Sequence, residues 1–378
     1  MSPLPSNEEV ESLRSLVVIC GLAIGMGFGV LAQHARFCVL GAMSDWVVMG
    51  SATRLRAYAL AMAVALMGTQ ALILLGLLDS GAVFYTNTRL LLASGLIGGL
   101  LFGLGMTLAS GCGARTLVRI GEGSLKALVV FLVMALTAFM TFRGVVALLR
   151  TQTVDQLAFA LPTRQDLPSL AAWAMQSSDS GPSLRLLVTS LMALALLGFA
   201  FWDREALGRK AREHWGAAGI GALIVISWFV TGYLGFIEEH PLTLERTYLA
   251  TNSKAPEGLS FVGPLAYTLE VLIYTTDKSQ TITFAIATVV GTVLGAFVSA
   301  KSNGSFRWGG FASTSDLSRH LLGAALMGIG GGTAMGCTIG HGLSGLSLLS
   351  LGSIMSTLAI LSGAWIGLRL LQGSDASH

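Results

Sequence analysis

The sequence predicts an all-α polytopic membrane protein with about nine transmembrane helices, short re-entrant helices and two inverted, pseudo-symmetric halves. Three observations predict this fold. Hydrophobic residues make up 53% of the 378 residues and charged residues only 11%, whereas soluble domains carry about 25% charged residues. Apolar stretches of about 20 residues, the length that crosses the hydrocarbon core, recur along the whole chain. The second half of the chain also repeats small residues and breaks of the first half.

Nine stretches have the length and the apolar character of membrane spans. We place them at residues 15–33, 57–78, 90–110, 127–148, 184–202, 217–236, 281–300, 320–338 and 353–371. Four further apolar segments are too short to cross a bilayer and are predicted as re-entrant or half helices. They cover residues 38–50, 113–124, 261–275 and 340–351.

The basic loops set the orientation, because cytoplasmic loops carry an excess of Lys and Arg. The loop at 203–216 is strongly basic, and we place it in the cytoplasm. Its basic residues are Arg204, Arg209, Lys210 and Arg212. The loop at 237–258 is acidic and fits the outside. With nine crossings, the N-terminus then lies outside and the C-terminus in the cytoplasm. The net charge of +3 is too small to indicate nucleic acid binding.

Matched residues at nearly constant offsets indicate an internal duplication. Cys112 and Cys337 lie 225 positions apart, and the small residues before them match at the same offset. These pairs are Gly98 with Gly323, Gly103 with Gly328, Gly105 with Gly330, Ala109 with Ala334 and Gly111 with Gly336. At an offset of 222, residues 38–41 fall on residues 260–263.

The duplication predicts four parts of the chain. They are an N-terminal four-span repeat with two short re-entrant segments at 1–148, an external linker loop at 149–183, a connecting span at 184–202, and a basic cytoplasmic loop followed by the inverted four-span repeat at 203–378. The odd connecting span turns the second half upside down. Inverted repeats place the substrate site near the bilayer midplane, where broken helices of the two halves meet.

Three cysteines occupy equivalent positions, each at the end of a small-residue helix: Cys38, Cys112 and Cys337, with Ser260 at the fourth such position. A lone buried cysteine usually acts as a small hydrophobe, and Cys20 fits that interpretation. Three cysteines at matched breaks instead indicate a substrate path. In apolar surroundings we expect these thiols to stay neutral, so that they face an anion as weak, polarizable donors.

The residues around the cysteines complete the candidate path. Glycine-rich breaks can present backbone N–H groups at the start of the next short helix, which is an anion site. Arg36 either draws an anion toward the cysteines or snorkels at the interface. His341 either contacts the substrate or hydrogen-bonds inside the break. The small residues included in the path are Gly111, Gly113, Gly336, Thr338 and Gly340.

Signatures of other functions are absent from the sequence. It contains no ATP-binding GxxxxGK[ST] loop, no HExxH and no dinucleotide-binding fingerprint. The four cysteines lack the CxxC spacing of a zinc or iron–sulfur site. We therefore predict no catalytic residue, no metal and no cofactor.

Four segments carry a resemblance to the YeeE/YedE sulphur-transport family, and they spread over nearly the whole chain. They are HARFCVLGAMSDW at 34–46, LASGCGAR at 108–115, SFVGP at 260–264 and GCTIGHGLSGLS at 336–347. The resemblance implies a nine-span inverted-repeat fold, import of thiosulfate, and a central row of cysteines, here Cys38, Cys112 and Cys337. It also implies a small cytoplasmic sulfur-carrier partner of the TusA type. The long loop at 149–183 and the basic loop at 203–216 depart from shorter members.

These observations together predict a bacterial inner-membrane permease and not an enzyme. The predicted cargo is a small sulfur-containing anion, above all thiosulfate, which crosses a midplane constriction lined by neutral thiols and helix N-termini. Three alternatives stay open. They are a transporter of a selenium or other sulfur species, a membrane sulfurtransferase or redox protein that uses the cysteines covalently, and a docking subunit that tethers a sulfur carrier at 203–216.

Overall fold

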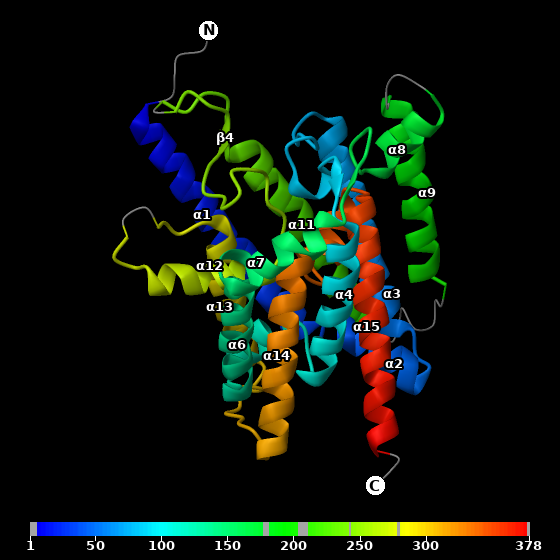
Figure 1. Cartoon of the computed structure of the whole chain (residues 1–378), viewed down its shortest axis with the longest axis vertical. Helices are drawn as coiled ribbons and strands as arrows, with labels where there is room; N and C mark the ends of the chain where they lie inside the picture. The colour runs from blue at the N-terminus through cyan, green and yellow to red at the C-terminus, as the bar shows by residue number, and fades with distance from the viewer. Residues whose placement is uncertain (1–5, 177–180, 203–210, 242, 278–279, 376–378) are drawn as a thin grey trace.

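The computed structural model describes residues 6–176, 181–202, 211–241, 243–277 and 280–375. Helices dominate these residues, and the prediction of an all-α class is confirmed. In Figure 1 most helices run along the long axis, α12 projects sideways from the bundle, and α9 stands at its edge. The described strands are two short antiparallel pairs. They are β1 (Arg89–Leu90) with β2 (Phe159–Ala160), and β3 (Phe236–Ile237) with β4 (Thr247–Tyr248).

The first half of the chain alternates long and short helices. They are α1 (Asn7–His34), α2 (Val39–Met49), α3 (Thr53–Leu74), α4 (Leu92–Leu108), α5 (Gly113–Gly121), α6 (Leu125–Arg143) and α7 (Val145–Gln152). The predicted short helices at 38–50 and 113–124 thus appear as α2 and α5. Each follows a long apolar helix after a break of a few residues.

The rest of the chain repeats this alternation. Its helices are α8 (Leu167–Ala174), α9 (Pro182–Ala200), α11 (Ala211–Phe229), α12 (Val262–Ile273), α13 (Phe284–Ser302), α14 (Thr314–Ala334) and α15 (Leu351–Asp375). Two π-helical segments accompany them, η3 (Val230–Leu234) and η4 (Gly340–Gly345). The segment at 340–351, predicted as a short helix, therefore begins as a π-helix, a form that frequently marks functional sites.

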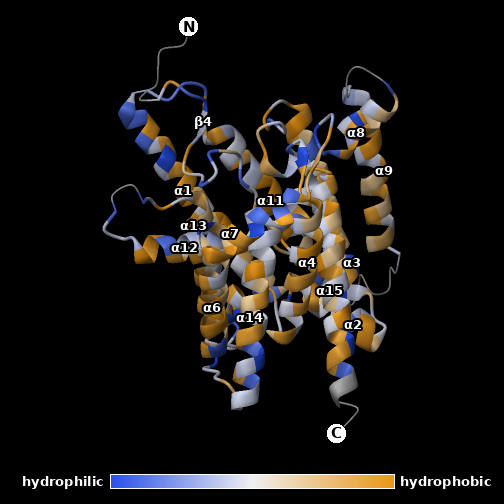
Figure 2. Cartoon of the chain, viewed as in Figure 1, coloured by the Kyte–Doolittle hydropathy of each residue, from blue (hydrophilic) through white to orange (hydrophobic). Residues whose placement is uncertain are grey.

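Among the described residues, eight helices are long and apolar enough to cross a membrane. Figure 2 shows their apolar residues as a band across the middle of the molecule, with polar residues concentrated toward the two ends. The predicted span at 320–338 is helical in α14, but it is not one of the eight. Polar residues in the first two turns of α14 and its many glycines lower its hydropathy. Nine crossings therefore remain a prediction.

The segment predicted as an external linker loop contains ordered structure in its described part. Between residues 149 and 176 lie the end of α7, the strand β2 and the helix α8. Asp166 at the start of α8 is fully buried, and its carboxylate accepts a hydrogen bond from Arg185 of α9 at 2.9 Å. Of the predicted cytoplasmic loop at 203–216, residues 203–210 lie outside the described residues, whereas residues 211–216, with Arg212, form the start of α11.

Close helix contacts hold the two halves together. α1 packs along α13 and α3 along α11, while α4 packs along both α14 and α15, and α6 along α14. Glycines make the closest of these contacts. A Cβ added at Gly295 of α13 would collide with the carbonyl of Met26 in α1. Small residues let membrane helices approach in this way, since lipid supplies no hydrophobic force between them.

We predict that Gly295→Ala destabilises the folded protein, because the new methyl group meets backbone that cannot move aside. Overpacking of this kind costs about 1–3 kcal/mol. Thermal unfolding of the detergent-purified protein, followed by loss of the monodisperse peak, measures the effect. Gly198 of α9 is the matched control, since nothing lies within 4 Å of an added Cβ there. An equal loss of stability in Gly198→Ala would contradict the packing argument.

Candidate functional site

Each cysteine of the predicted row lies where one helix has ended and a short one begins. Cys38 is the N-cap of α2, and its Sγ accepts a hydrogen bond from the N–H of Gly41 at 3.4 Å. Cys112 is the N-cap of α5. Cys337 precedes η4, and its Sγ accepts from the N–H of Gly340 at 3.4 Å. At Cys38 and Cys337 the sulfur thus takes the position usually held by a Ser, Thr or Asp oxygen, beside converging backbone N–H groups.

The same backbone feature precedes all three cysteines. Two residues before each cysteine the chain adopts a left-handed conformation, at Arg36 (φ 50°), Ser110 (φ 56°) and Met335 (φ 59°). None of these residues is a glycine, although left-handed backbone is costly for other residue types. Strained backbone persists only where the surrounding structure enforces it, and it clusters at functional sites.

The structure brings the cysteines and the serine of the predicted row together. Ser260 Oγ lies 3.8 Å from Cys337 Sγ. The side chain of Thr338, the residue after Cys337, lies close to the thiol of Cys112. The thiol of Cys112 lies close to the thiol of Cys38. Cys38 and Cys112 also line one cavity of about 10 Å³, which we call the central gap. The four side chains thus lie in one neighbourhood, and we call them the sulfur row.

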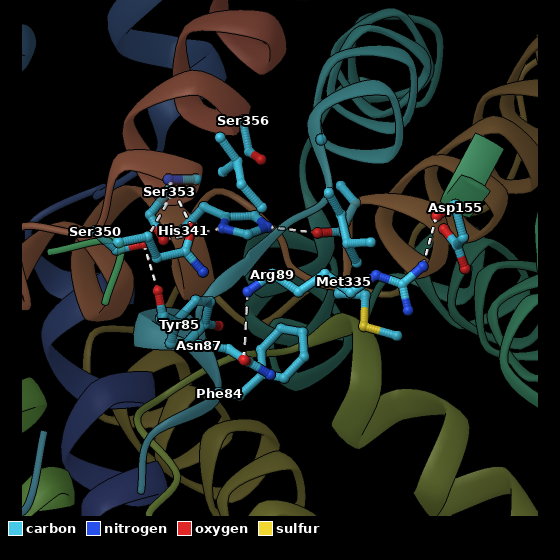
Figure 3. Close-up of a pocket in the computed structure, with 16 residues that line it drawn as sticks. Phe84, Tyr85, Asn87, Arg89, Asp155, Met335, His341, Ser350, Ser353 and Ser356 are labelled. Atoms are coloured by element: carbon cyan, nitrogen blue, oxygen red, sulfur yellow. Dashed lines mark hydrogen bonds between the residues drawn. The ribbon is translucent and has the colours of Figure 1, made fainter. Parts of the chain in front are cut away.

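Two larger cavities lie at the Cys337 end of the row. The Ser260 cavity, about 280 Å³, is lined by Ser260 and Tyr267. The His341 cavity, about 290 Å³, is lined by His341 and Arg89 (Figure 3). Both cavities are also lined by Phe84, Tyr85 and Met335.

The other end of the row is nearly closed. The Cys38 cavity, lined by Cys38, Arg36, Arg54, Tyr58 and Glu213 among others, has a volume of about 10 Å³. The central gap has the same volume. A space of this size holds about one water molecule. The row is therefore accessible from the Ser260 cavity and occluded toward Cys38.

His341 holds the helix break in place and does not touch a cysteine sulfur. Its Nε2 lies 2.8 Å from the carbonyl oxygen of Ala334, the last residue of α14, and its Nδ1 lies 3.3 Å from Ser353 Oγ. Figure 3 shows the imidazole between these two partners. A Cβ added at Gly336 would lie 2.6 Å from the ring. The geometry fits the interpretation of His341 as a hydrogen-bonding residue inside the break.

The predicted small residues keep backbone close to the row. A Cβ added at Gly340 would lie 2.7 Å from Ser260 Oγ and 2.9 Å from the hydroxyl of Tyr85. Gly113 begins α5 against the side chain of Met134. Gly111 lies beneath the side chain of Arg115. A larger residue at Gly340 would therefore push into the row, whereas an added Cβ at Gly111 or Gly113 would make ordinary contacts.

The arginines near the row differ in their partners. Arg115 forms an ion pair with Glu122 at 3.3 Å, so its charge is already compensated. Arg36 is exposed and lines the Cys38 cavity together with Arg54. Its placement beside Cys38 fits the predicted attraction of an anion toward the row.

Sequence reasoning missed several residues of the site. Tyr58 donates from its hydroxyl to the carbonyl of Thr338 at 3.1 Å, and this bond ties α3 to the break after Cys337. Tyr85 and Met335 line both large cavities, and Glu213 lines the Cys38 cavity. The tyrosine in the predicted span 57–78 was the available signal for a polar contact at membrane depth. The other three carry no recognisable motif.

Comparison with known proteins decides the family. A sequence profile described as sulphur transport matches residues 34–366. The chain belongs to this family, as the YeeE/YedE resemblance predicted. It is 28% identical to the thiosulfate transporter TsuA of Escherichia coli, over 93% of this chain and 94% of that protein. It is 26% identical to the thiosulfate transporter TsuA of Spirochaeta thermophila, over 91% of this chain and 96% of that protein.

A second group of relatives is similar over a shorter range. The probable transporter YedE of Salmonella typhimurium is 34% identical over 105 residues, which is 27% of this chain and 24% of that protein. Family membership and the apolar helices together establish a multi-pass membrane protein of a sulphur transport family.

We predict that Ser110→Val destabilises the protein by about 1–2 kcal/mol, because a β-branched residue fits left-handed backbone poorly. Ser110→Asn is the matched control, since Asn tolerates this conformation. Thermal unfolding of both variants measures the difference. Equal stability of the two variants would show that the left-handed conformation at Ser110 does not constrain the break.

Proposed function

We propose that this protein is a permease that imports a small sulfur-containing anion, thiosulfate, across the bacterial inner membrane. One observation carries the proposal. Three thiols and one hydroxyl, from four separate helix breaks, form a single row between the Ser260 cavity and the Cys38 cavity. The names of the two TsuA relatives, which align over more than nine-tenths of the chain, support thiosulfate as the cargo.

The chemistry of the row suits an anion with one soft sulfur and several charged oxygens. Neutral thiols are weak donors with polarizable sulfur, and they carry no charge that repels an anion. The N-termini of α2 and α5 add the positive end of the helix dipole beside Cys38 and Cys112. Successive weak contacts let the anion enter and also leave, which conduction requires.

The helix contacts support two inverted halves. We pair each helix of the first half with its counterpart in the second half, in chain order: α1 with α11, α2 with α12, α3 with α13, α4 with α14 and α6 with α15. Under this pairing the contact of α1 with α13 corresponds to the contact of α11 with α3. Likewise the contact of α4 with α15 becomes that of α14 with α6, and α4 with α14 is its own counterpart. In inverted repeats the substrate site lies where the halves meet, and this arrangement supports the sulfur row as the site.

The direction of transport follows from the charges at the end of the molecule where α1 ends and α11 begins. Arg212 at the start of α11 donates to His34 Nδ1 at 2.6 Å, and Arg36 and Arg54 lie nearby in the Cys38 cavity. By the positive-inside rule this end faces the cytoplasm. The anion then enters at the Ser260 cavity and leaves at Cys38, where a TusA-like carrier would receive its sulfur.

We predict that Cys38→Ala, Cys112→Ala and Cys337→Ala each reduce uptake of ³⁵S-thiosulfate at least tenfold. The measurement uses a bacterial host that lacks its own thiosulfate uptake, with thiosulfate as sole sulfur source and expression levels matched. Cys20→Ala is the control, because Cys20 lies in the middle of α1 and lines none of the cavities described. Wild-type uptake by all three variants would end the proposal.

Two further arms separate the alternatives. Stronger inhibition of this uptake by selenosulfate than by the same excess of unlabelled thiosulfate would favour a selenium species as the cargo. Mass spectrometry of the purified protein after exposure to thiosulfate tests a covalent sulfurtransferase step. A sulfur atom added to one of the three cysteines would favour that step, whereas unmodified cysteines support transport through weak contacts.

A further inference from the structure

Glu213 stands out as a half-buried carboxylate with one buried oxygen that no hydrogen bond satisfies. It lies in the first turn of α11, and its Oε2 atom is buried with no hydrogen-bond donor around it. Among the described residues it forms no ion pair. A buried carboxylate oxygen left unsatisfied is costly, and such groups in native proteins call for an explanation. A stabilising role at the helix N-terminus accounts for an acidic residue in this turn, but not for an oxygen that no N–H group reaches.

Packing fixes the position of Glu213 at the inner end of the sulfur row. Arg212, the preceding residue, is bonded to His34 at the end of α1. One turn later a Cβ added at Gly216 would collide with the Cβ of Ala35. α11 therefore begins tightly against the break that precedes Cys38, and the Glu213 side chain lines the Cys38 cavity.

Arg54 faces the same cavity from α3. A Cβ added at Gly41 would lie 2.9 Å from Arg54 Nη1 and 3.9 Å from Cys38 Sγ, so the guanidinium and the thiol flank the same glycine. Arg54 Nε lies 3.2 Å from Asp45 Oδ2, yet it has no hydrogen bond of acceptable geometry. A guanidinium N–H group and a carboxylate oxygen, both buried and both without a hydrogen bond, thus line one small space beside Cys38.

We propose that Glu213 is the inner gate of the anion path, and that its carboxylate occupies the place beside Cys38 and Arg54 which the departing anion takes. This inference rests on the proposed function, because it presumes that an anion reaches Cys38. A small sulfur oxyanion carries the same charged oxygens as a carboxylate and would fill the same space, which Arg54 and Arg36 also line. Release of the anion then requires Glu213 to move aside, and the return of Glu213 closes the cavity.

The gate accounts for two features of the site. The Cys38 cavity is nearly closed although it is lined by two arginines, because the carboxylate holds the space. A fixed negative charge also keeps other anions of the cytoplasm from entering the row by the same route, while arginine attracts the anion from within. Glu213 would therefore set both the closure and the selectivity of the inner mouth.

The test measures how fast Cys38 reacts with small charged thiol reagents from the cytoplasmic side. Inside-out vesicles containing the full chain are treated with an anionic methanethiosulfonate, the sulfonatoethyl compound, or with its trimethylammonium counterpart. Peptide mass spectrometry then measures the modification of Cys38. In Glu213→Gln we expect the anionic reagent to react about tenfold faster than in the wild type, the order of effect for one charge at a partly buried site. The cationic reagent should react no faster.

Two control variants keep the result interpretable. Glu213→Asp retains the charge and should keep the wild-type ratio of anionic to cationic rates, even where its packing is changed. Glu239→Gln removes an exposed carboxylate between β3 and β4, away from the row, and should change neither rate.

Other outcomes overturn the gate. If Glu213→Gln accelerates both reagents equally, the change has only loosened the packing, and if it accelerates neither, Glu213 does not guard Cys38. The labelling requires no thiosulfate, so it is independent of the uptake experiment. A charge-selective gate in a protein whose cysteine variants still import thiosulfate would show that the gate is real and that the proposed cargo or path is wrong.

Discussion

The whole site depends on one constraint, which is the way three helices are stopped inside an apolar bundle. At each stop a residue other than glycine is held in left-handed backbone, and two residues later a cysteine caps the next short helix. Stopping a helix in a membrane exposes backbone groups that lipid cannot satisfy. Here thiol sulfurs accept hydrogen bonds from the N–H groups of Gly41 and Gly340. Tyr58 and His341 bond to backbone carbonyl oxygens on either side of Cys337. The groups that satisfy the breaks are also those that line the path.

Glycine packing determines where the breaks meet. The contacts of α1 with α13 and of α4 with α14 are close enough that backbone meets backbone. Helices this close bring their ends to nearly the same point, so that Cys337 lies beside Ser260 of its own half and near Cys112 of the other half. The glycines that pack the helices thus also determine where the thiols lie. The glycines have no chemical role, but without them the row would be four separate helix ends.

The sequence could reveal the breaks and the cysteines because both leave a local pattern. Short apolar segments after a small-residue helix and a Cys predicted the positions of α2 and α5, and the match of residues 260–263 to 38–41 added the position of α12. The left-handed residues could not be predicted, since Arg36, Ser110 and Met335 have no preference for that conformation and only tertiary packing enforces it. Glu213 was equally hidden, because it lies far from Cys38 in the chain and only the meeting of α1 and α11 brings them together.

The asymmetry of the cavities limits how transport can proceed. The Cys337 end of the row adjoins two spaces of nearly 300 Å³, whereas the central gap and the Cys38 cavity each hold about one water molecule. A sulfur oxyanion is several times larger than water, so the Ser260 cavity can hold it beside Ser260, but it cannot pass Cys112 without movement. The backbone of the breaks is held by bonds on both sides, which leaves side chains as the parts most able to move. Opening of the row toward Cys38 therefore requires the displacement of a few side chains. Those beside Cys38 are charged, so an anion attracts or repels them.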